Sequence, residues 1–144
     1  MERDLLRRLG DKSLTTDVLY KSVERDFGLV PRLLEGVSSS KASVRYGCAK
    51  VLTDLSAAYP EKLYPHFDFF VSLLSSKYRI LVWNALAITA NLAIVDKDKK
   101  FDIVFDKYFG FLNDGYMVTV ANVFGHSGKI ALAKPYLIDM ITDE

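Results

Sequence analysis

Apolar residues in this chain recur in a pattern that returns every 34 to 37 residues. The segment from Leu29 to Val37 has a counterpart 34 residues later, from Leu63 to Val71, and both are short, largely apolar stretches. After a short loop, each is followed by a longer apolar stretch. Self-similarity at this period indicates supersecondary units that must bury their apolar faces against neighbouring copies.

The longer stretches have the spacing of amphipathic helices. A shift of 37 residues superposes their apolar positions at intervals of 0, 4, 7 and 11 residues, which lie on one helical face. The stripes are Val44, Cys48, Val51 and Leu55 in one copy and Leu81, Ala85, Ile88 and Leu92 in the next. A shift of 36 residues adds a third stripe, Met117, Ala121, Phe124 and Gly128.

Local signals favour helices throughout the chain. No stretch alternates apolar and polar residues between hairpin turns, so the sequence predicts no strands. A further helix is expected after a cap at Thr15 or Thr16 and before Gly28. The prolines placed where a helix can begin are Pro60, Pro65 and Pro135. We therefore predict an all-α chain.

The paired helices resemble the HEAT and armadillo family of helical repeats. The resemblance rests on Val44 and Arg45 followed by Ala49, and on Pro31 and Pro65 early in the shorter helices. It implies an all-α, right-handed α-α superhelix, a HEAT/ARM-like solenoid of about three and a half helix pairs. The implied single domain, residues 1–144, divides into a partial repeat 1–28, repeats of about 29–60, 61–97 and 98–133, and a partial repeat 134–144.

Families that this chain resembles usually bind proteins, and a minority bind nucleic acid. The resemblance implies a non-catalytic interaction scaffold that binds a protein or peptide partner on the concave face of its second helices. The candidate contact residues are Lys50, Asp54, Trp83, Asn84, Asn91 and Ser127. Asn amides can donate and accept hydrogen bonds with an extended peptide. Asn84 and Asn91 could equally bond to neighbouring backbone, and Trp83 could pack between repeats.

Two other functions stay open at this point. The chain could be a nucleic-acid-binding solenoid, including an enzyme similar to alkylpurine DNA glycosylases, with Asp54 and Trp83 as the nearest candidate residues. It could instead be a spacer or assembly subunit that works through the ends of its stack. The balance of 19 Lys and Arg against 18 Asp and Glu opposes a role in neutralising phosphates.

Enzyme and metal signatures fail on spacing. Gly125-His-Ser-Gly-Lys has two residues between its glycines, where a phosphate-binding loop has four, and Ile130 follows its lysine. His66 and His126 belong to different copies and have no companion ligands at zinc spacing. We therefore expect no catalytic residue, no cofactor and no metal.

The sequence favours a cytoplasmic protein. Cys48 is the single cysteine, as is common in the reducing cytosol, and its place on the first stripe predicts a small buried hydrophobe. The charged N-terminal segment is no secretory signal. The longest apolar stretch, residues 80–95, carries Asn84 and Asn91 and is too short to span a bilayer.

Two further groups of residues lie off the apolar stripes. We interpret the basic residues at the turns as solvated helix starts rather than as a phosphate-binding ridge. They are Lys41, Arg45, Lys77 and Arg79. Phe69, Phe109 and Phe111 either form a second interface or are covered by neighbouring loops.

Residues 134–144 begin a shorter helix whose apolar stripe has no following partner in the sequence. Terminal repeats normally have a polar outer face. We therefore expect this half repeat to self-associate or to continue into a longer parent chain. Light scattering tests the expectation, and a monomer that binds no dye for exposed apolar surface would contradict it.

Overall fold

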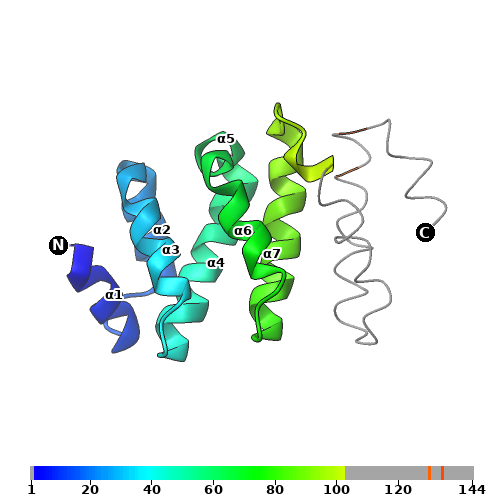
Figure 1. Ribbon diagram of the computed structural model, residues 1–144. Coiled ribbons are helices and arrows are strands. Elements are labelled where there is room, and N and C mark those ends of the chain that lie inside the picture. The colour runs from blue at the N-terminus through cyan, green and yellow to red at the C-terminus, as the bar shows by residue number, and fades with distance from the viewer. Residues whose placement is uncertain (1, 103–129, 131–133, 135–144) are drawn as a thin grey trace. The chain divides into compact units, whose positions relative to one another are not determined.

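The computed structural model describes residues 2–102, 130 and 134, with side chains from Leu6 onward. Every regular element in this part of the chain is helical, which confirms the predicted all-α class (Figure 1). The chain forms two compact units, Met1–Ala58 and Tyr59–Glu144. Among the described helices, none has the length and apolar character needed to cross a bilayer. The right-handed solenoid and the single repeat domain stay predictions.

The described elements of the first unit are α1 (Glu2–Gly10), α2 (Thr16–Arg25), η1 (Phe27–Leu29), α3 (Val30–Val37) and α4 (Ala42–Ala58). Thr15 caps α2, because its side-chain oxygen accepts a hydrogen bond from the Val18 amide at 3.3 Å, as the capping prediction requires. The helix ends at Arg25, earlier than predicted. Asp26 leaves the helical conformation there, and its carboxylate accepts a hydrogen bond from the Gly28 amide at 2.9 Å.

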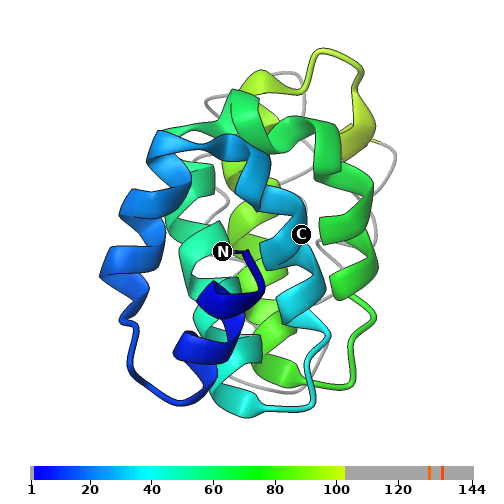
Figure 2. The same cartoon turned by 90° about the vertical axis from the view of Figure 1, so that its left-hand side faces the viewer.

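Helix α4 is the centre of the first unit, since α1, α2 and α3 all pack against it. Figure 2 views the unit from the side of α1 and shows these helices around α4. The predicted stripe of α4 is buried throughout. Burial also extends beyond it, to Arg45, Ala49, Leu52 and Ser56. A single stripe underestimates the buried surface because α4 is covered on more than one side.

Gly36 allows α3 to approach α4 closely. A Cβ atom at this position would overlap with Sγ of Cys48 and lie 3.2 Å from Cδ2 of Leu6.

Cys48 is fully buried, which confirms the prediction of a small buried hydrophobe. Burial raises the pKa of its thiol to about 12. The thiol therefore stays protonated near neutral pH, where a protonated thiol is a poor nucleophile.

Arg45 is 7% exposed, so the prediction of a solvated helix-start residue is wrong at this position. Its guanidinium donates a hydrogen bond to the carbonyl oxygen of Ser39 at 3.1 Å and lies 4.6 Å from the ring centroid of Tyr46. Lys41, in the same turn, is exposed as predicted. Arg45 is buried because the turn between α3 and α4 presents carbonyl groups that need a donor.

The described elements of the second unit are α5 (Pro60–Leu63), η2 (Tyr64–His66), α6 (Phe67–Leu73), α7 (Arg79–Leu92) and η3 (Ala93–Val95). α6 packs along α7, and α5 contacts both α7 and η3. The predicted stripe of α7 is buried throughout. Pro60 and Pro65 stand in first-turn positions, as predicted. Pro135, the third stripe, Phe109 and Phe111 lie outside the described residues.

Gly36→Ala should lower the free energy of unfolding by about 1–3 kcal/mol, because the added Cβ must displace the Cys48 sulfur within a packed core. In a Cys48→Ala background the same substitution should be neutral or stabilising, since alanine favours a helix over glycine by about 1 kcal/mol. Urea unfolding followed by circular dichroism measures both effects. If the effects of the two substitutions simply add, the contact between residue 36 and the Cys48 sulfur does not limit how closely α3 approaches α4.

Candidate functional site

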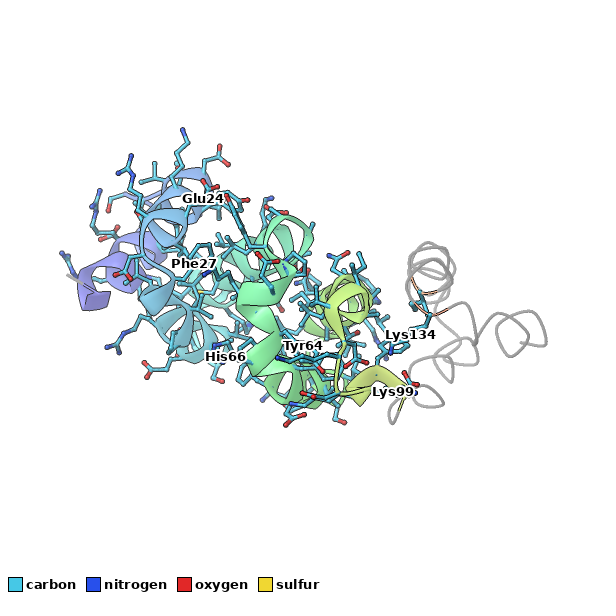
Figure 3. The ribbon with its side chains drawn as sticks, turned by 90° about the horizontal axis from the view of Figure 1, so that it is seen from above. Glu24, Phe27, Tyr64, His66, Lys99 and Lys134 are labelled. Atoms are coloured by element: carbon cyan, nitrogen blue, oxygen red, sulfur yellow. The ribbon has the colours of Figure 1, made fainter. Side chains whose placement is uncertain are left out.

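A hollow of about 360 Å³ opens on the first unit between α2 and α4. Its lining residues are Thr16, Asp17, Tyr20, Lys21 and Glu24 of α2 and Asp54 of α4. Their spacing places the α2 residues on one helical face, while Leu19 and Val23 are buried. Glu24, labelled in Figure 3, marks this exposed face. Leu19 and Val23 anchor α2 in the core, and the polar face of α2 therefore stays open to solvent.

Negative charge dominates this hollow. Among the lining residues, the carboxylates of Asp17, Glu24 and Asp54 outnumber the one ammonium group, that of Lys21. Burial raises the pKa of Tyr20, and the charges of Glu24 and Asp54 raise it further. The Tyr20 hydroxyl therefore stays protonated and can donate a hydrogen bond within a negative field.

Lys50 and Asp54, two of the predicted contact residues, meet where Asp54 lines the hollow. The Lys50 Nζ lies 2.9 Å from Asp54 Oδ2 across one turn of α4. This hydrogen bond raises the pKa of Lys50, and the negative charges of Asp54 and Asp17 add to the shift. The two side chains are 60% and 50% exposed. A surface pair of this kind is worth about 0.3–0.5 kcal/mol, so a partner could replace it at little cost.

The other predicted contact residues lie on α7 or outside the described part of the chain. Trp83 and Asn84 are half-buried, and Asn91 is 5% exposed. Asn91 therefore offers little surface to a partner, while Asn84, two turns earlier on the same face, is more accessible. Ser127 lies outside the described residues. Partner binding by these side chains stays a prediction.

Sequence reasoning missed the α2 side of the hollow. Asp17, Lys21 and Glu24 follow one another at intervals of 4 and 3 residues, which is the spacing of one helical face. The signal is present in the sequence. The packing of α2 beside α4 is what shows that this face continues to Asp54.

A buried polar cluster in the second unit, centred on Asp96, was also missed. Its Oδ1 accepts hydrogen bonds from the Tyr64 hydroxyl at 2.6 Å and the Lys100 amide at 2.8 Å. Its Oδ2 accepts one from the Phe101 amide at 2.7 Å and lies 3.1 Å from Nζ of Lys134. Figure 3 labels Tyr64 and Lys134, which reach this cluster from separate stretches of the second unit.

Lys134 supplies the positive charge that faces the buried carboxylate of Asp96. The Lys134 Nζ also lies 2.8 Å from Oδ1 of Asp102, so one ammonium serves two carboxylates. Burial acts to raise the pKa of Asp96, but hydrogen bonds from Tyr64 and the other donors outweigh it and lower this pKa below 3.8. Burial and the bond to Asp96 raise the pKa of Tyr64 to about 12. Neither group exchanges protons near neutral pH, so the arrangement suits packing rather than acid–base catalysis.

Two further observations bear on the kind of site. In the part of the chain that the structure describes, no group of three or more His, Cys, Asp or Glu side chains is placed to hold a metal ion. Comparisons of the chain with protein-family models, curated proteins and solved structures gave no match. Function is therefore inferred from the described residues themselves, and the α2–α4 hollow is the candidate binding surface among them.

The second unit should lose stability in acid through Asp96. Its folded-state pKa is lowered, so the stability from its ionised form is present above about pH 3.8 and is lost as the pH falls through the folded-state pKa. Asp96→Asn should lower stability at pH 7 and flatten this acid dependence in urea unfolding. Asp68→Asn, at a side chain that is 86% exposed, is the matched control. An acid dependence unchanged by Asp96→Asn would contradict the assignment.

Proposed function

We propose that this protein is a non-catalytic interaction module that binds a protein or peptide partner on a face formed by its longer helices. The observation that carries the proposal is the hollow of about 360 Å³ between α2 and α4. Most of its lining residues carry a charge, and none of them is a large aliphatic residue. Small-molecule sites are lined mainly by apolar groups, so this surface is better suited to a polar segment of another protein.

The chemistry of the hollow favours a basic side chain from the partner. A lysine or arginine that enters it would meet the carboxylates of Glu24 and Asp54, which also act on Tyr20. The Tyr20 ring, which is half-buried, adds a surface on which a guanidinium could stack. The same negative charge would repel a nucleic-acid backbone, which disfavours the DNA-binding alternative at this surface.

The wider proposal is a HEAT-like solenoid whose second helices carry the partner surface. It is supported by the pairing within each unit, where the shorter helix packs along the longer one, α3 on α4 and α6 on α7. In this proposal Trp83 and Asn84 of α7 are the candidate contact residues of the second unit. The proposal assigns no catalytic residue, and the strongest described pKa shifts, those of Cys48 and Tyr64, hold both groups protonated.

A charge reversal in the hollow tests the proposal. Wild-type protein and the Glu24→Lys/Asp54→Lys variant are immobilised, and partners captured from a native lysate are quantified by mass spectrometry. Recovery of the wild-type partner should fall at least about tenfold with the variant, which corresponds to about 1.4 kcal/mol of binding free energy. Circular dichroism should be unchanged, because both substituted side chains are exposed.

Glu61→Lys/Asp68→Lys is the matched control, since it makes the same change of charge at exposed residues of α5 and α6. It should capture the partner as the wild type does. Capture that survives the hollow variant would refute this contact surface, and equal loss in both variants would indicate a non-specific charge effect. Binding of a labelled DNA duplex that weakens steeply with salt would support the nucleic-acid alternative instead.

A further inference from the structure

Tyr64 and Lys134 hold equivalent places in the repeating pattern. Each directly precedes a proline, and 70 residues, or two repeat lengths, separate them. Both side chains are buried, at 6% and 4% exposure. Val30 precedes the corresponding proline of the first unit and is buried at 2% exposure. An apolar residue can therefore fill this buried position, as Val30 does in the first unit. The burial of two polar residues at the same position in the second unit has to be explained in another way.

Asp96 supplies that explanation because both polar groups converge on its carboxylate. The Tyr64 hydroxyl binds one oxygen, and the Lys134 ammonium lies beside the other. The amides of Lys100 and Phe101 bind the same two oxygens. The side chain of Asp96 is completely buried. A donor that moves away therefore leaves the charge of this carboxylate less compensated.

Such a cluster tolerates misalignment poorly. Buried ion pairs add little stability compared with apolar packing, but removing one partner leaves an uncompensated buried charge. Tyr64 begins the 3-10 helix η2, in which a slip of one residue moves a side chain by about 2 Å and rotates it by about 120°. Either Tyr64 or Lys134 would then lose contact with Asp96, whereas a valine at the same place can repack against other apolar groups.

We propose that Asp96 is a register lock in the second unit. It fixes Tyr64 relative to Lys134, because only one alignment brings both donors to its two oxygens. Asp102 completes the lock by holding the Lys134 ammonium from another direction, at 2.8 Å. The lock is a positioning device and does not depend on the proposed partner surface.

Lys134→Met tests the lock, since it keeps most of the aliphatic stem and removes the charge. Amide hydrogen exchange at Lys100 and Phe101 should accelerate at least about tenfold, because their shared acceptor loses a partner. The NMR signals of these amides should broaden or split as other registers become populated. Amide exchange in the middle of α7 should accelerate less than at Lys100 and Phe101, because the loss of alignment opens the unit locally in addition to any general loss of stability.

Two control variants separate this effect from a general loss of charge or stability. Lys97→Met removes the exposed lysine that follows Asp96 in the sequence, and it should leave amide exchange at Lys100 unchanged. Lys134→Arg keeps the charge and should retain a single set of amide signals.

A double variant shows whether the two donors act through one group. Tyr64→Phe/Lys134→Met should accelerate exchange at Phe101 by less than the product of the single effects, since both donors act on Asp96. If the two single effects on amide exchange multiply in the double variant, the proposed lock is wrong. It is also wrong if Lys134→Met leaves amide exchange at Lys100 unchanged. Equal acceleration throughout α7 would also overturn it, because the substitution would then act only through the overall stability of the unit.

Discussion

Burial of α4 and α7 on more than one side is the constraint on which the rest of the described structure depends. A helix of this kind cannot satisfy its apolar residues with one neighbour. In the first unit α4 is therefore packed by α1, α2 and α3, and the close approach of α3 requires the missing side chain of Gly36. In the second unit α7 is packed by α6 and α5. In the described part of each unit, shorter helices consequently cover one long helix.

This arrangement separates the residues that hold the fold from those available to a partner. The face of α2 that carries Tyr20 and Glu24 is free of core residues, because Leu19 and Val23 anchor the helix from another side. Exposed pairs such as Lys50 with Asp54 contribute little to stability. The chemistry of the α2–α4 hollow is thus barely constrained by folding, as a binding surface requires.

Polar groups in the interior follow a different rule, because each needs hydrogen-bond partners where it is buried. Arg45 donates a hydrogen bond to a carbonyl of the adjoining turn, whereas Asp96 gathers donors from Tyr64, Lys134 and two amides. The first arrangement closes a local turn. The second joins positions distant in the sequence, so it constrains how those stretches align and contributes to specificity more than to stability.

Apolar spacing identified both described core stripes. The absence of a strand pattern and the local capping and proline signals identified the helical class, a cap at Thr15 or Thr16 and the helix starts at Pro60 and Pro65. These features depend on local helix geometry, which the spacing of residue types encodes directly. Burial of Arg45 and Lys134 and the joining of α2 to Asp54 in one hollow were not readable in this way. A polar side chain can be buried where distant groups supply its hydrogen bonds, and those groups come together only when the helices pack.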